Sequence, residues 1–225
     1  MHNFIKILIV PIILIFLYGC SDNTINIYEK KYSGEGYEVS MEIPELREDT
    51  DFANKFNSEY ITFADNTLNS FIAEAENTAT STDSLSLKQE IKFNKNGLAS
   101  IVGDCETFTG GPHTTSEKIV KNIDTKNGIF LSFKKMFSDD TYVNRINSYI
   151  STLLETNPEK FDELWKTPTV SENQNFYITP HGLVLLYPPY ELSYYSKGFV
   201  EIEIPYKEIE SYLNPDYSFL SDRKN

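Results

Sequence analysis

The stretch that decides the fold is residues 85–107, which read LSLKQEIKFNKNGLASIVGDCET. Its first part alternates apolar and polar side chains from Leu85 to Phe93, as expected of a strand with one buried face. The following Asn94–Gly97 consists of residues that tolerate the positive φ angles of a tight turn. A return strand from Leu98 to about Thr107 then completes a predicted antiparallel hairpin.

The segments on either side of this hairpin predict more strands than helices. Helical spacing of apolar side chains predicts a long amphipathic helix over about residues 51–77 and a second one from about residue 142. Strand patterns occur at Tyr37–Ile43, Lys118–Asp124, Asn175–Ile178, Leu183–Tyr187 and Phe199–Ile204. We therefore expect the α+β class, with a mainly antiparallel sheet, one long N-terminal helix and a second helix packed on it.

The first twenty residues have the features of a secretion signal. Lys6 lies in a short N-terminal region, and the uncharged apolar run Ile7–Leu17 is too short to span a bilayer. The run ends in Leu17-Tyr18-Gly19-Cys20, which resembles the bacterial lipobox, in which the cysteine is acylated and becomes the mature N-terminus. We predict lipidation of Cys20; an ordinary signal peptide or a buried N-terminal helix are the alternatives.

Composition narrows the possible partners. The 225 residues include 33 acidic and 20 basic ones, which gives a formal net charge of −13, and removal of Lys6 with a signal peptide would make it −14. Nucleic acid is therefore not expected as a partner, since phosphate binding needs a basic surface. With three His and two Cys, few ligands are available for a metal, and neither a metal site nor a cofactor is predicted.

Five short motifs follow one another from residue 110 onward: Gly110-Gly111-Pro112-His113, Phe176-Tyr177-Ile178-Thr179, Gly182-Leu183-Val184, Tyr190-Glu191-Leu192 with Gly198, and Ile204-Pro205-Tyr206. Their order resembles the extracellular domain shared by RsiV-type anti-sigma factors and PdaC-type peptidoglycan deacetylases. The resemblance covers about Tyr37 to Leu213. It departs from the family pattern at Pro112, where Ala is usual, and at Ser193-Tyr194, where Ala-Pro is common.

The resemblance implies a division of the chain and a role. We expect a signal peptide at 1–19, a polar tether at 20–33, a PdaC-like α+β part at 34–124, an RsiV-like α+β part at 125–214 and a loose tail at 215–225. In RsiV-like proteins this domain is a receptor for lysozyme, and in PdaC-like proteins it accompanies the enzyme domain. The resemblance therefore implies a binding module in the cell envelope, anchored to a membrane and facing outside the cytoplasm. Because Ser21 is not the Asp that retains lipoproteins in the inner membrane, an outer membrane is the expected location where the cell has one.

No catalytic residue is carried over by the resemblance. Gly110 and Gly111 indicate positive φ or close backbone approach, and His113 is expected to brace that bend by a hydrogen bond to backbone. The His-x-x-x-His pair of zinc deacetylases and the Gly-x-Ser-x-Gly of serine hydrolases are absent. Cys105 is expected to be a small buried hydrophobe. A peptidoglycan-modifying hydrolase with an unrecognised active site remains the alternative function.

A cluster of tyrosines is the best candidate for a contact surface. Tyr187, Tyr190, Tyr194 and Tyr195 lie within nine residues that also contain Pro188-Pro189. A loop of this composition can form a rigid surface with little entropy to lose, so Tyr190, Tyr194 and Tyr195 are the predicted partner-binding residues. The expected partner is a cationic muramidase of the lysozyme type, or peptidoglycan itself, on which the rings could stack. The alternative is that Tyr187 and Tyr190 only pack the sheet.

Overall fold

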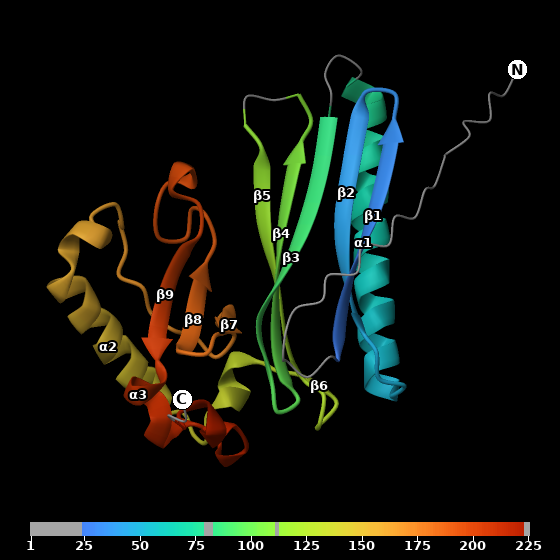
Figure 1. The fold of residues 1–225 in the computed structure, drawn as a ribbon. Helices are drawn as coiled ribbons and strands as arrows, with labels where there is room; N and C mark the ends of the chain where they lie inside the picture. Colours follow the sequence, from blue (N-terminus) through green and yellow to red (C-terminus); the bar gives the residue numbers. More distant parts are fainter. Residues whose placement is uncertain (1–23, 79–82, 111–112, 223–225) are drawn as a thin grey trace, which may run out of the picture. The chain divides into compact units, whose positions relative to one another are not determined.

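The computed structural model describes residues 24–78, 83–110 and 113–222, which form two compact units (Figure 1). The first unit holds the described residues up to Ile119 together with Thr125–Ile129. The second holds Val120–Asp124 and the chain from Phe130 onward. Neither unit is therefore one continuous segment, because strand β5 (Thr115–Asp124) begins in the first unit and ends in the second.

The larger sheet has the order β1-β2-β3-β4-β5-β6. Its other strands are β1 (Ile25–Gly34), β2 (Tyr37–Leu46), β3 (Asp83–Lys95), β4 (Leu98–Phe108) and β6 (Ile129–Phe130). The predicted hairpin is confirmed: β3 and β4 are antiparallel, and Asn96 and Gly97 have positive φ angles of 58° and 79° in the turn. A register shift between Ile91 and Phe93 leaves Lys92 as the extra residue of a β-bulge.

One strand pair of the larger sheet is parallel. β2 and β3 are parallel, with Tyr37 opposite Asp83, and helix α1 (Asp51–Thr78) connects them. At about 1.5 Å per residue a helix of this length spans roughly 42 Å, whereas a ten-residue strand spans roughly 33 Å. The helix can therefore return the chain to the end of the sheet where β2 began, and the sheet as a whole remains mainly antiparallel.

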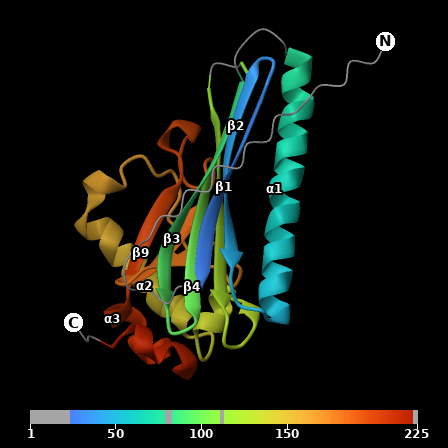
Figure 2. The same cartoon turned by 45° about the vertical axis from the view of Figure 1, so that its right-hand side comes forward.

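Helix α1 lies along one face of the sheet and packs on β2 and β3 (Figure 2). The hydroxyl of Thr50 accepts a hydrogen bond from the Ala53 amide at 3.1 Å and caps the helix. The Asn57 side chain binds both the amide and the carbonyl of Leu46, at 2.8 and 2.9 Å, which fixes the helix to the end of β2. One face of the helix is buried, as the helical spacing predicted: Ala53, Phe56, Tyr60, Ala64, Leu68, Phe71 and Ala75.

The second unit is built on the antiparallel sheet β7-β8-β9, formed by β7 (Phe176–Ile178), β8 (Gly182–Tyr187) and β9 (Val200–Pro205). The predicted second helix, α2 (Tyr142–Thr156), packs on β9 and on α3 (Tyr206–Ile209). The Arg145 guanidinium joins the two helices, because it donates to the Glu208 carbonyl at 2.9 Å and pairs with the Glu208 carboxylate. Short 3-10 helices complete the unit: Phe133–Met136, Pro158–Lys160, Tyr195–Lys197, Glu210–Tyr212 and Pro215–Leu220.

Two expectations about the ends of the described chain are wrong. The segment expected as a tether contains β1, which pairs with β2 along all ten of its residues. The segment expected as a loose tail contains the 3-10 helix Pro215–Leu220, in which Tyr217 and Leu220 are buried. The Tyr217 hydroxyl donates to the buried Asp124 carboxylate at 3.0 Å, and this bond holds the segment to the second unit. Among the described residues, no helix is long and apolar enough to cross a membrane.

Candidate functional site

The predicted contact residues lie in the loop that joins β8 to β9 in the second unit. The loop is folded by hydrogen bonds within its own backbone: the Tyr190 amide donates to the Ser193 carbonyl and the Glu191 amide to the Pro188 carbonyl, both at 3.2 Å. Tyr190 has a φ of 69°, a left-handed conformation that is costly for a bulky residue. Such a conformation persists where the surrounding structure determines it, so this loop is held in one shape.

Aromatic rings cover this loop in two pairs. The ring centroids of Tyr190 and Tyr195 are 5.5 Å apart, and those of Tyr194 and Trp165 are 5.1 Å apart in an edge-to-face arrangement. Tyr190, Tyr194 and Trp165 are 68, 64 and 51% exposed. We call these four residues the aromatic patch. The structure thus brings the three predicted tyrosines together and adds Trp165, which the sequence analysis missed.

The aromatic patch is supported from beneath by buried residues. The Trp165 amide donates to the Leu192 carbonyl at 3.1 Å, and the Ser193 hydroxyl donates to the Glu163 carbonyl at 2.8 Å. Leu192 and Ser193 are both buried. Two segments that are far apart in sequence are therefore fastened side by side, which keeps the exposed rings in place. By contrast, Tyr187 is buried and packs the sheet, as the alternative interpretation had proposed for it.

An ion pair lies at the border of the patch. The Lys197 ammonium is 2.5 Å from a Glu163 carboxylate oxygen, and both side chains are largely in solvent. The hydrogen bond to Glu163, with the nearby Asp162 carboxylate, raises the pKa of Lys197. The pair joins the loop to the segment that carries Trp165, and exposed pairs of this kind contribute little to stability.

The predicted bend at Gly110 lies in the first unit, where Gly110 has a φ of 78°. Gly111 lies outside the described residues. His113 is exposed in the loop that precedes β5, and His181 is exposed in the turn between β7 and β8. Among the residues that the structure describes, no group of three or more His, Cys, Asp and Glu side chains is placed to hold a metal ion.

Cys105 is a free, buried thiol on β4, as expected. Burial, with smaller contributions from the Glu117 and Glu106 carboxylates, raises the pKa of this thiol. A raised pKa lowers the thiolate fraction, which is the nucleophilic form. The side chain therefore has the properties of a core residue rather than those of a nucleophile. Cys20, the predicted lipidation site, lies outside the described residues.

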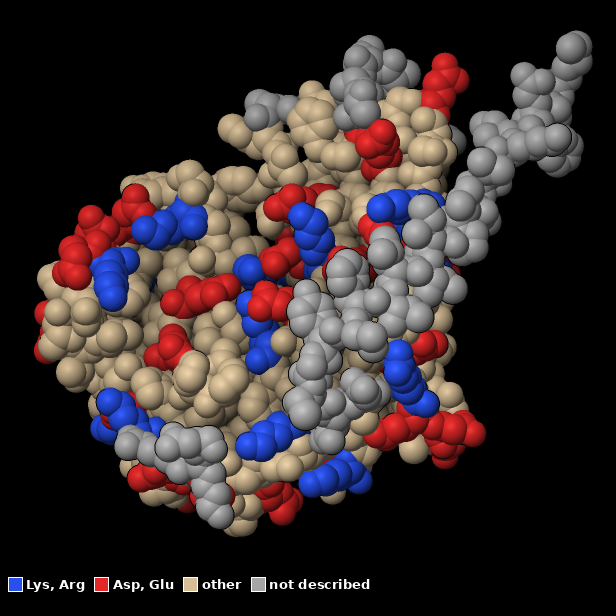
Figure 3. All heavy atoms as spheres, in the orientation of Figure 1, with Lys and Arg blue, Asp and Glu red and all other residues tan. Residues whose placement is uncertain are grey.

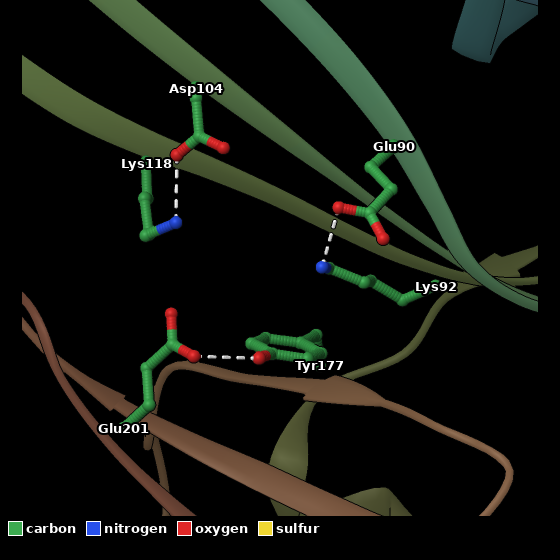
Figure 4. A network of polar contacts seen from close by, with 6 residues as sticks. All are labelled: Glu90, Lys92, Asp104, Lys118, Tyr177 and Glu201. Carbon is green, nitrogen blue, oxygen red and sulfur yellow. Dashed lines mark hydrogen bonds and ion pairs between the residues drawn. The ribbon is translucent and has the colours of Figure 1, made fainter.

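Several charged side chains outside the aromatic patch form polar contacts with neighbouring residues. In the first unit, Lys118 contacts Asp104 at 2.7 Å and Lys92 contacts Glu90 at 2.6 Å (Figure 4). In the second unit, the Tyr177 hydroxyl donates to Glu201 at 2.8 Å. On the face shown in Figure 3, basic side chains lie among the acidic ones rather than apart from them. The negative net charge is therefore not gathered into one acidic area on that face.

Comparison with known proteins first defines the class of domain. Residues 134–207 match the family model described as "Protein of unknown function (DUF3298)". Over 153 residues, 56% of this chain, the sequence is 31% identical to anti-sigma-V factor RsiV of Bacillus subtilis strain 168. The predicted resemblance to the RsiV-type domain is thereby confirmed. The match covers 52% of RsiV, so this chain spans about half the length of that curated relative.

Two solved structures have the same fold. A DUF3298 family member from Bacteroides fragilis NCTC 9343 superposes with a TM-score of 0.67 over 91% of this chain and 98% of its own, at 16% identity. A DUF3298 family protein from Pseudomonas aeruginosa PAO1 superposes with a TM-score of 0.63 over 85% of this chain and 94% of its own, at 18% identity. At these identities the likeness shows the shared α+β fold, and the expected fold class is confirmed.

Proposed function

We propose that this protein is a lipoprotein of the bacterial cell envelope that binds a cationic, lysozyme-like protein through the aromatic patch. The observation that carries the proposal is that two aromatic pairs cover the loop between β8 and β9, Trp165 with Tyr194 and Tyr190 with Tyr195, in which all rings but the half-buried Tyr195 are exposed. Exposed aromatic residues in a preformed loop lose little entropy on binding and are typical centres of protein interfaces. The match to RsiV and the implied lysozyme receptor role of that domain support the choice of partner.

Net charge supports the same class of partner. With a formal charge of −13, the protein attracts cations, although this attraction is screened beyond about 8 Å at physiological salt. Charge alone would give loose association with any basic protein. Specific binding therefore needs a packed centre, and the aromatic patch supplies one.

The test is surface-based kinetics with the full chain, captured in detergent through a C-terminal tag, against a lysozyme at two salt concentrations. We expect binding that weakens as salt rises. Tyr194→Ala combined with Tyr195→Ala should raise the off-rate about 5- to 150-fold, the factor for roughly 1–3 kcal/mol. Ile61→Ala, which truncates an exposed apolar residue on α1, is the matched control and should leave the off-rate unchanged.

Two outcomes would contradict this choice of partner. Equal binding to an unrelated protein of the same positive charge would reduce the effect to nonspecific attraction. Absence of binding to any muramidase, with retention on purified peptidoglycan that the tyrosine variant loses, would make cell-wall glycan the ligand of the aromatic patch.

Anchoring through Cys20 is a separate part of the proposal, and it rests on the lipobox-like sequence. We expect Cys20→Ala to abolish incorporation of a labelled fatty acid and to impair cleavage before residue 20. Release into the soluble fraction is not required, because an uncleaved apolar segment could still hold the chain to the membrane. A variant that is labelled and cleaved like the wild type would disprove lipidation at this residue.

A further inference from the structure

Strand β1 forms one edge of the larger sheet. All ten of its residues pair with β2, and no other described strand pairs with its opposite side. An edge strand presents unpaired N–H and C=O groups to any other strand. Proteins commonly block such an edge with a proline, a bulge or charged side chains. β1, with the sequence INIYEKKYSG, has no proline and an uninterrupted register. Its charged residues are of both signs, so they can pair with an incoming strand that carries the opposite charges. Its backbone is therefore able to accept another strand.

The side chains of β1 divide between the two faces of the sheet. Tyr28, Lys30 and Tyr32 lie opposite the buried residues Ile43, Met41 and Val39, on the face covered by α1. Lys30 lies 4.0 Å from Asp65 of that helix. The other face carries Glu29 and Lys31, which form an ion pair of 3.0 Å within the strand. On the face covered by α1, the edge therefore has Lys30 between two tyrosines. On the other face it has one acidic and one basic side chain.

We propose that the β1 edge pairs with the β1 edge of a second copy of this chain, antiparallel about a twofold axis at Lys30. Residues equally far before and after Lys30 then face each other on the same side of the sheet. Glu29 lies opposite Lys31 of the partner subunit, and Tyr28 lies opposite Tyr32 of the partner subunit. Both pairs occur twice because of the symmetry, and the two sheets join into one.

Charge favours this register over its two neighbours because each of the three registers has one like-charged pair at its axis, but only this one also forms two opposite-charge pairs. With the axis at Glu29, that carboxylate would face its own copy, and with the axis at Lys31, two ammonium groups would meet. Like charges directly opposite each other destabilise a strand pair. With the axis at Lys30, two carboxylates and two ammonium groups alternate around the centre. The two copies of Lys30 do meet on the other face, where Asp65 of each copy offsets the charge.

Charge reversal tests the register on the full chain in detergent, with association measured by sedimentation. Lys31→Glu and Glu29→Lys should each weaken self-association about tenfold, since each creates two like-charged cross-strand pairs. The combined Glu29→Lys, Lys31→Glu chain should associate as tightly as the wild type. Lys88→Glu, on an exposed residue of β3, makes the same charge change away from the edge and should have no effect.

Oxidative cross-linking tests the position of the axis. Directly opposite Cβ atoms are about 4.5–5.5 Å apart in antiparallel pairs, close to the span of a disulfide at about 3.5–4.5 Å. Lys30→Cys should therefore cross-link to its own copy, whereas Lys55→Cys on an exposed part of α1 should not. Glu29→Cys should cross-link when mixed with Lys31→Cys. A monomeric chain at all soluble concentrations, or a charge-swapped chain as weak as the single variants, would overturn the proposal.

Discussion

Aromatic side chains differ in exposure between α1 of the first unit and the loop between β8 and β9 of the second. On α1, Phe56 and Tyr60 follow helical spacing and are buried against the sheet at 1 and 2% exposure. In the loop between β8 and β9, Tyr190 and Tyr194 are exposed to solvent although backbone hydrogen bonds fold the segment. Aromatic content alone therefore does not identify a binding surface. What identifies it is an exposed ring on a backbone whose hydrogen bonds are already satisfied.

The largest expected effect is on stability and comes from the buried aromatic residues of α1. Phe56→Ala should lower the free energy of unfolding by about 3–5 kcal/mol, because it removes buried apolar area and leaves a cavity. Denaturant unfolding followed by circular dichroism measures the loss. Thr62→Ala, at an exposed position of the same helix, should cost under about 0.5 kcal/mol. A loss below about 1 kcal/mol for Phe56→Ala would show that α1 does not bury a continuous core.

Removal of an exposed aromatic ring should give the reverse result, with little loss of stability and a large loss of binding. Trp165→Ala removes an edge-to-face contact with Tyr194, and we expect it to cost about 1 kcal/mol or less in stability. The same change should raise the off-rate of a bound muramidase about 5- to 150-fold if Trp165 is a central contact. Unfolding curves and surface kinetics on the same preparation separate the two effects. A large stability loss with unchanged binding would place Trp165 in the core rather than in the patch.

These two aromatic groups also differ in how well sequence could predict them. Regular spacing along α1 identified Phe56 and Tyr60, because a helix converts sequence distance directly into a face. Trp165 was missed because its partner Tyr194 is far away in sequence, and the two segments are joined by contacts that no local pattern reveals, such as the hydrogen bonds to Leu192 and from Ser193. β1 was taken for a tether because its residues are half-exposed at an edge, where no burial pattern develops. Elements with a regular burial pattern are thus predictable from the sequence, whereas Trp165 depends on a contact between distant segments and β1 has no such pattern although its partner β2 follows directly.

A smaller effect on stability should come from the backbone conformation of the loop alone, measured between two variants that both lack the Tyr190 ring. Tyr190 has a φ of 69°, which glycine adopts at no steric cost. Tyr190→Gly should therefore be more stable than Tyr190→Ala by about 1 kcal/mol, although both lose the ring and should bind a partner equally weakly. Urea unfolding of the two variants measures the difference. Equal stabilities would mean that the left-handed conformation is not retained once the ring is removed.

The last predicted effect is a loss of unfolding free energy caused by buried tyrosines, which is absent at neutral pH and grows at alkaline pH. Burial raises the pKa of Tyr60, Tyr187 and Tyr206 above the value of about 10 of an unfolded chain. These phenols bind their protons more tightly in the folded state, so their contribution is complete below about pH 10 and falls as pH rises further. Unfolding free energies measured from pH 8 to 11 should decline at the alkaline end. Tyr60→Phe should decline less steeply than the wild type, whereas an equal slope would exclude Tyr60 as a source.

The path of the chain between the two units has a consequence for synthesis on the ribosome. Val120–Asp124 belongs to the second unit, yet Thr125–Ile129 returns to the first before the rest of the second is made. The first unit cannot be completed until residue 129 has left the exit tunnel. By then the segment for the second unit has already emerged, but its partners follow one at a time: Leu131 soon after, Phe176 later and Tyr217 only near the end of the chain. A gene cut at any single point between residues 119 and 130 would therefore leave at least one of the two units without part of its chain.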